Sequence, residues 1–275
     1  MKVQDTEWFK GFVRMADDGW HMGWHECNGG NLSYRIKREE AADVRDSFGS
    51  GEWKDIGTSV PELGGEFFLI TGSGKFFRNI ILMPEDTLGI VEVDESGSRY
   101  RLVWGFINGA RPTSELITHL MNHQIKKRIS EDRFRVVYHA HPSNIIALSF
   151  ILPLEDEVFT RELWGIMTEC PIVFPRGIGI VPWLVPGSVE LGEATAELMD
   201  KYDAAVWAHH GMFATGEDFD HTFGLMHTVE KSAGILLKQM SSGRDKLSEI
   251  SPDQFRRLAG RYGLTLDERF LSRKE

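Results

Sequence analysis

The sequence predicts an α/β fold of the α+β type: one domain over residues 1–275, with a central, mostly antiparallel β-sheet between helical layers. Apolar segments of strand length alternate along the chain with segments of helical periodicity. Several neighbouring strand segments are joined by short polar turns, which is typical of hairpins and therefore of antiparallel pairing. No linker separates two cores, and 275 residues fit one large domain.

The N-terminal part predicts a helix, a polar loop and three strands. Apolar side chains recur at helical spacing and predict an amphipathic helix over residues 5–22: Trp8, Phe9, Phe12, Val13, Ala16 and Trp20. Residues 38–65 are polar and rich in glycine, so we expect a surface loop there, with a short strand at most. Strands are predicted over 67–74, 88–93 and 100–106, the last two as a hairpin around the turn DESGS.

The C-terminal part continues the alternation of helices and strands. Helices are predicted over five ranges: 112–129, 155–167, 188–201, 219–241 and 252–262. The first of these is opened by Pro-Thr-Ser, a typical helix start. Strands are predicted over 134–142, 171–175 and 204–211.

Composition and charge limit the classes of partner. Apolar residues make up 41% of the chain and charged residues 26%, as in soluble globular proteins. No apolar run approaches the roughly 20 residues that span a bilayer, and no signal peptide is expected. A net charge of −10 argues against nucleic acid as a partner. Cys27 and Cys170 do not form a CxxC pair, so a reducing cytoplasmic location is expected.

Two histidines end the strand predicted over 134–142. His139 and His141 project from the same face of a strand and precede a proline, so both rings can be aimed at one point. A metal ion accepts this arrangement, with Zn–N bonds of about 2.0–2.1 Å. Two core histidines bonded to backbone carbonyls are the alternative, and the pair alone does not decide between them.

Further ligands favour the metal. His209 and His210 end another predicted strand, and only one of them can join the first pair because adjacent strand residues face opposite sides. Glu115 lies in the predicted first turn of the 112–129 helix, where the helix dipole is expected to hold the carboxylate ionised. Three imidazoles beside a carboxylate, with room for substrate, are typical of a catalytic zinc site.

Other histidine pairs have metal-ligand spacing but weaker support. Glu115, His119 and His123 share one helical face, and His21 and His25 repeat the same four-residue step. With ten histidines in the chain such pairs also arise by chance. A further rival is a metallohydrolase built on His-x-His, but no third strand end supplies its usual extra ligands.

Three polar turns predict a site for a small phosphorylated ligand. Residues 27–33, 71–77 and 111–115 are rich in Gly, Asn, Ser and Thr, which offer backbone and side-chain donors to an anion. Each is an ordinary turn when taken alone, and none matches a P-loop or a dinucleotide fingerprint. Lys75 lies in the second turn and is a candidate for a Schiff-base mechanism, although a role in shaping the turn is favoured.

These segments together resemble the class II aldolase/adducin family. The resemblance is carried, in order, by NGGNLS, FLITGSGKFFRN, LGIVEVD, PTSEL, HAHPSNIIALSF, VFTRELWGIMTEC, GIGIVPWLVPG and HHGMFATG, and covers almost the whole chain. It implies the sheet and helical layers described above, in a homotetramer with active sites near subunit interfaces. It also implies one Zn²⁺ per subunit on His139, His141 and His210. The sequence departs from the family pattern in having a second histidine, His209, beside the last of these.

The resemblance implies roles for further residues. Glu115 corresponds to the catalytic carboxylate, and Glu169 to a second acidic position that reaches a neighbouring subunit's site. The phosphate-binding turns correspond to Asn28, Gly30, Asn31, Ser73, Gly74, Thr113 and Ser114.

The segments FFRN, RELWGIMTEC and PWLVPG resemble the branch of the family that acts on L-rhamnulose 1-phosphate. That branch releases dihydroxyacetone phosphate and L-lactaldehyde by retro-aldol cleavage. An aldolase for L-fuculose 1-phosphate and an epimerase for L-ribulose 5-phosphate are alternatives within the family. A non-catalytic, adducin-like interaction module is a third, and the retained histidines and Glu115 argue against it.

Overall fold

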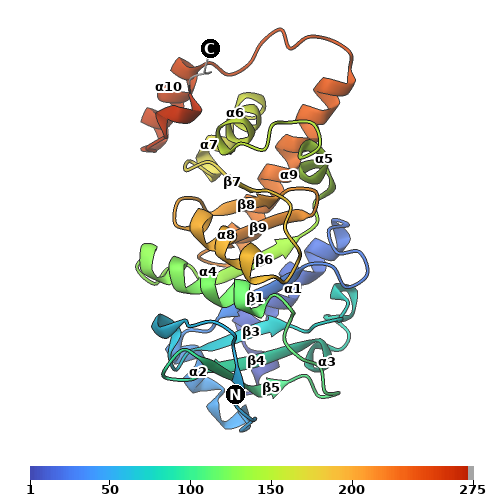
Figure 1. The fold of residues 1–275 in the computed structure, drawn as a ribbon, viewed down its shortest axis with the longest axis vertical. Helices are drawn as coiled ribbons and strands as arrows, with labels where there is room; N and C mark the ends of the chain where they lie inside the picture. The colour runs from blue at the N-terminus through green and yellow to red at the C-terminus, as the bar shows by residue number, and fades with distance from the viewer. Residues whose placement is uncertain (272–275) are drawn as a thin grey trace.

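One sheet organises the residues that the structure, a computed structural model, describes, namely 1–271. Its nine strands lie in the order β2-β5-β4-β3-β1-β6-β9-β8-β7, and only β7 and β8 pair in parallel. The predicted mostly antiparallel sheet is therefore confirmed (Figure 1). The strands are β1 (Asn31–Arg35), β2 (Lys54–Asp55), β3 (Phe67–Thr71), β4 (Leu88–Val93), β5 (Arg99–Gly105), β6 (Val136–Ala140), β7 (Gly179–Val181), β8 (Ala204–Trp207) and β9 (Gly211–Gly216).

Helices cover both faces of the sheet. They are α1 (Glu7–His21), α2 (Arg38–Asp43), α3 (Pro84–Thr87), α4 (Leu116–Ile129), α5 (Ser143–Leu148), α6 (Asp156–Ile166), α7 (Cys170–Val173), α8 (Val189–Met199), α9 (Phe219–Ser241) and α10 (Pro252–Tyr262). Helices α4 and α8 pack on each other, and α9 packs on α1, α5 and α6 (Figure 1). Among the described residues, no helix is long and apolar enough to cross a membrane.

Strand β1 shows how the two helical layers are built. Ser33 hydrogen-bonds the side chains of His119 and His123 on α4. The next residue, Tyr34, packs its ring against Trp8 of α1 and Phe219 of α9. Because successive strand residues point to opposite faces, this alternation places α4 on one side of the sheet and α1 with α9 on the other.

The structure corrects four details of the predicted elements. The 38–65 segment contains the short helix α2 besides the two-residue strand β2. Residues 171–175 are not a strand, because Pro171 lies in the first turn of α7 and proline suits that position. The helix predicted from 112 begins only at Leu116. Strands β1 and β9 and helix α5 were not predicted, and β1 is buried along its length despite its polar residues.

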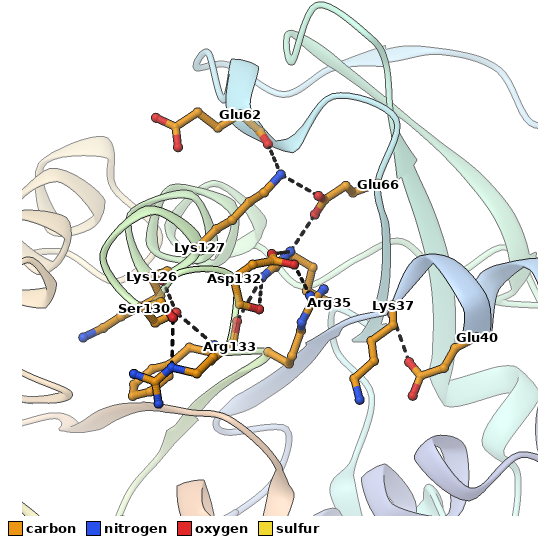
Figure 2. A network of polar contacts seen from close by, with 12 residues as sticks. Arg35, Lys37, Glu40, Glu62, Glu66, Lys126, Lys127, Ser130, Asp132 and Arg133 are labelled. Atoms are coloured by element: carbon orange, nitrogen blue, oxygen red, sulfur yellow. Dashed lines mark hydrogen bonds and ion pairs between the residues drawn. The ribbon is translucent and has the colours of Figure 1, made fainter.

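Ion pairs fasten the end of β1 that lies away from Asn31. The Arg35 guanidinium is fully buried and contacts Glu66 and Asp132, while Lys127 of α4 reaches Glu66 and the Glu62 carbonyl (Figure 2). Buried charges are tolerated when they are paired in this way. A cavity of about 610 Å³ opens beside this network and is lined partly by Glu66 and Asp132, so it belongs to a region remote from the histidines.

Candidate metal centre and active site

Three histidines converge where interior strands of the sheet end. His139 is on β6, His141 follows the end of that strand, and His210 lies in the turn between β8 and β9. Their ring centroids form a nearly equilateral triangle with sides of 5.0, 4.9 and 5.0 Å. One nitrogen from each ring lies within 4.8 Å of the others, an arrangement that can hold a metal ion.

Hydrogen bonds on the far sides of the rings orient them. His139 Nδ1 donates to the Met212 carbonyl at 3.1 Å, and His141 Nδ1 donates to Glu26 Oε1 at 2.6 Å. A neutral imidazole has one N–H, so the Nε2 atoms of both rings carry bare lone pairs. These two Nε2 atoms face each other at 3.3 Å. Two lone pairs at that distance repel unless a cation lies between them, which is the pattern of metal-ligating histidines.

Burial favours the neutral form of His139 and His210. His139 is 1% exposed, and burial lowers its pKa well below the usual range. Burial followed by the neighbouring His141 lowers the pKa of His210 to about 4. A metal ligand must be unprotonated, so these environments favour the form that binds a cation.

The turn between β8 and β9 selects His210 over His209. His209 has φ of +63°, a left-handed conformation that is uncommon for a non-glycine residue, and its N–H donates to Ser149 Oγ at 2.8 Å. The next residue, His210, joins the cluster. Gly211 makes room for the other two rings, because a Cβ there would lie 2.4 Å from the Ala140 carbonyl and 3.0 Å from the rings of His139 and His141.

The three polar turns lie side by side next to the histidines. The Ser73 N–H donates to the Arg111 carbonyl, and the Thr113 N–H donates to the Thr71 carbonyl, which joins the second turn to the third. Thr71 Oγ1 accepts from the Leu32 N–H and so ties both to the first. Gly30, with φ of +76°, leaves no space for a Cβ, which would lie 2.6 Å from the His139 carbonyl.

Most of the predicted anion-binding residues are accessible in these turns. Asn28, Ser73, Gly74 and Ser114 are exposed, whereas Asn31 and Thr113 are 5% and 7% exposed. The Asn31 amide is already bonded on both sides, to Glu115 and to His119. An amide nitrogen carries two hydrogens, so one Nδ2–H of Asn31 remains for another acceptor.

Glu115 lies at the start of α4, but not as predicted. It is the N-cap residue and makes no cap hydrogen bond, because its Oε2 accepts from Asn31 Nδ2 at 2.8 Å. The carboxylate is 6% exposed, and burial raises its pKa against the opposing effect of that hydrogen bond. Burial therefore opposes the helix dipole that was expected to hold Glu115 ionised.

The remaining candidates are placed elsewhere. Glu169 is the exposed N-cap residue of α7. Helix α7 packs on α6, α9 and α10, whereas the histidine cluster lies at the ends of β6 and β8. His25 is a buried structural residue that bonds the Gly29 carbonyl and the Tyr138 hydroxyl. Lys75 forms an ion pair with Asp86 at 2.8 Å.

Sequence reasoning missed Glu26 and Ser149. Glu26 is 66% exposed and directly precedes the glycine-rich turn, and nothing in its neighbours marks an acceptor for His141. Ser149 ends α5, a helix that was not predicted. Only the tertiary pairing of β1 with β6 and of α5 with the β8–β9 turn brings these two residues to the rings.

Residues 11–237 match the family described as Class II Aldolase and Adducin N-terminal domain. A rhamnulose-1-phosphate aldolase of Mannheimia succiniciproducens is 44% identical over 262 residues, which cover 94% of this chain and 96% of that protein. The enzyme of the same name from Escherichia coli O139:H28 is 43% identical over 260 residues, covering 94% of each.

Solved structures share the fold. A sugar-phosphate aldolase from Thermotoga maritima superposes with a TM-score of 0.73 at 29% identity, over 85% of this chain and 95% of that one. An L-fuculose 1-phosphate aldolase superposes with a TM-score of 0.61 over 94% and 98% of the two chains. At 19% identity this second likeness concerns the fold alone.

We predict that the buried histidines make the protein acid-sensitive. Burial lowers the pKa of His25 and of His119 to about 3, from an unfolded value of 6.5. Below pH 6.5 the unfolded chain then binds more protons than the folded protein does. The free energy of unfolding is therefore at its full value above pH 6.5. It falls by about 1.4 kcal/mol per pH unit for each ring as the pH drops toward 3. Urea unfolding at pH 7.5 and 5.5 measures this, and His119→Gln should reduce the loss. Equal stabilities at both pH values would contradict it.

We predict that Glu26→Gln weakens metal binding without disturbing the fold. The substitution keeps the size of an exposed side chain but removes the carboxylate that fixes the His141 ring. Loss of such a partner typically costs about 10–100-fold in metal affinity. Competition with a chromogenic chelator measures the affinity. Glu7→Gln, at an exposed position on α1, is the control; equal affinities in the two variants would contradict the prediction.

Proposed function

The chain belongs to the class II aldolase and adducin family, and from this premise we propose that it cleaves L-rhamnulose 1-phosphate to dihydroxyacetone phosphate and L-lactaldehyde. The reaction is a retro-aldol cleavage by a metal-dependent carbon–carbon lyase. The observation that carries the proposal is the convergence of three histidines beside a buried carboxylate and three polar turns. Relatives named for this substrate, at 42–44% identity over 94% of the chain, support the choice of sugar.

We propose Zn²⁺, one per subunit, as the metal, held by His139, His141 and His210. Two nitrogens bound to one zinc at 2.0–2.1 Å in tetrahedral geometry lie about 3.3 Å apart. The Nε2 atoms of His139 and His141 are separated by 3.3 Å, so this donor set fits zinc. When bound, the ion supplies a Lewis acid that stabilises the negative charge developing on the substrate's ketone oxygen.

The polar turns hold the far end of the substrate. The backbone N–H groups of Gly74 and Ser114 and the hydroxyls of Ser73, Thr113 and Ser114 are assigned to the phosphate. Asn28, Gly30 and Asn31 are assigned to it as well. The anchored phosphate sets the position of the reacting carbons relative to Glu115 and thereby lowers the entropic part of the barrier.

Glu115 is assigned the proton at the reacting carbon. Cleavage breaks the C3–C4 bond, and the C3 carbon then takes a proton from the Glu115 carboxyl; in the condensation direction Glu115 removes it. The raised pKa of this buried group suits both roles, because a general acid–base works best near the operating pH.

Glu169 is assigned the proton on the aldehyde-side oxygen, in a neighbouring subunit's site of a homotetramer. Its exposure and its distance in the fold from the histidines of its own chain support a role across an interface. Large exposed apolar side chains also support an interface near the site. The Phe150 ring packs against His209 at a tilt of 38°, and Trp183 and Val185 precede Gly187, which lies against Ser114.

A Schiff-base mechanism is the rival within aldolase chemistry. It requires a desolvated lysine free to attack a carbonyl. Lys75, the lysine of the second turn, is paired with Asp86 at 2.8 Å, which disfavours that role. Sensitivity to a chelator separates the two mechanisms.

We predict that release of dihydroxyacetone phosphate from L-rhamnulose 1-phosphate stops with a chelator and returns with Zn²⁺. L-Fuculose 1-phosphate and L-ribulose 5-phosphate are tested alongside as the rival substrates. Cleavage that is indifferent to the chelator, or a preference for another sugar, would overturn the proposal.

Glu115→Gln should bind zinc normally and lose at least about 100-fold in kcat, since general acid–base catalysis contributes that much.

We also predict that His210→Ala and His209→Ala differ sharply in zinc content. The first removes a converging ring, whereas the second leaves all three rings in place. The zinc that each protein retains after gel filtration is measured by inductively coupled plasma emission spectrometry. It should fall to a small fraction of the wild-type content in His210→Ala but not in His209→Ala. The reverse pattern would exchange the two assignments.

A further inference from the structure

A chain of hydrogen bonds runs from Glu115 into the core. Asn31 Nδ2 donates to Glu115 Oε2 at 2.8 Å, and Asn31 Oδ1 lies 2.5 Å from His119 Nε2. His119 Nδ1 lies 2.6 Å from Ser33 Oγ, which in turn lies 2.8 Å from His123 Nε2. None of the last three residues is assigned to substrate or metal in the function proposed above.

The direction of every donor in this chain follows from its first member. Because Asn31 Nδ2 faces the carboxylate, its Oδ1 must accept, and His119 therefore carries its proton on Nε2. The bare Nδ1 of His119 then accepts from the Ser33 hydroxyl, whose oxygen accepts from His123 Nε2–H. All donors thus point toward Glu115 (a single consistent pattern of tautomers).

This series of hydrogen-bonded side chains is costly to bury, and the series ends at Glu115. Ser33 and His119 are 0% exposed and His123 is 1% exposed. Buried polar groups destabilise a fold unless they are fully bonded, and apolar residues at these positions would avoid the cost. His119 and His123 were candidates for a second metal site, but Ser33 lies between them and bonds both.

We propose that His119, fixed by Ser33 and His123, is a positioning residue for proton transfer: it holds the Asn31 amide in the orientation that donates to Glu115. A flipped amide would turn Oδ1 toward the carboxylate and repel it. The backbone of Asn31 is already fixed opposite His139 in the β1–β6 pair, so only its side chain needs this support. The inference rests on the proposed function, because it presumes that Glu115 moves the proton.

The test follows hydrogen exchange on dihydroxyacetone phosphate. Zinc-loaded protein in D₂O should replace one hydrogen at C3, where Glu115 removes a proton and returns a deuteron. In His119→Phe we expect the exchange rate at saturation to fall about 10–100-fold, since small misplacements of a catalytic group cost this much. Zinc affinity should stay within about threefold of the wild type, because the three histidines assigned to the metal are untouched. Measuring the rate at saturating substrate separates the exchange step from any weaker binding through Asn31.

Two further variants separate positioning from stability. His119→Gln retains an N–H near the Nε2 position and should recover exchange to within about threefold of the wild type, as expected if one hydrogen bond is decisive. Asn122→Leu removes a different buried hydrogen bond on α4, to the Thr118 carbonyl, and should leave exchange unchanged. Wild-type exchange in His119→Phe, or equal losses in all three variants, would overturn the proposal. If His119→Phe fails to fold, Ser33→Ala takes its place with a smaller expected loss.

The tautomer gives a readout that does not depend on catalysis. In protein labelled with ¹⁵N at histidine, His119 should show the Nε2–H form, with Nδ1 unprotonated. The Nδ1–H form would contradict the proposal, because Asn31 Oδ1 would then face a lone pair. If wild-type protein exchanges no hydrogen, the proposed function fails, and the tautomer still decides whether the chain orients Asn31 as inferred.

Discussion

The pairing of β1 with β6 is the constraint on which the site depends. In this antiparallel register Asn31 lies opposite His139, so the start of β1 meets the end of β6 that carries the histidines. Residues 28–31 are thereby brought against the histidines, and the Asn31 side chain against Glu115. A slip of one residue would turn Asn31 and Ser33 to the opposite face and separate the carboxylate from its support.

Some side chains of the site lie on strands and helices, and others lie in tight turns. Strand β6 and helix α4 fix His139 and Glu115, whereas His141, His210 and the anion donors lie where the chain reverses. Ordered turns need their own supports, and the structure provides them: Glu26 for His141, Ser149 for the His209 backbone, and Arg111 and Thr71 carbonyls for the polar turns. Such supports fix geometry before the ligand arrives, which is the basis of preorganised catalysis.

Local patterns predicted most of the fold, and contacts between distant segments account for what they missed. Helices α1, α9 and α10 and the β4–β5 hairpin followed from periodicity and turn residues. Strand β1 was missed because Asn31, Ser33 and Arg35 are polar, and each is buried only because a partner distant in sequence pairs with it. The spacing of His139 and His141 allowed a metal site without deciding for it, and the further histidines and Glu115 favoured it. The role of Glu26 and the chain through His119 depend on side-chain geometry that spacing does not contain.

A visible absorption spectrum of the cobalt-loaded protein tests most directly whether the three histidines hold a metal where the sugar phosphate binds. With one Co²⁺ per chain, we expect the intense bands of a low-coordinate histidine site, and a saturable change in them on addition of dihydroxyacetone phosphate. Inorganic phosphate at the same concentration should change them less, because it lacks the ketone and hydroxyl oxygens. The weak spectrum of aqueous cobalt, or intense bands that ignore dihydroxyacetone phosphate, would contradict a metal-dependent aldolase at this site.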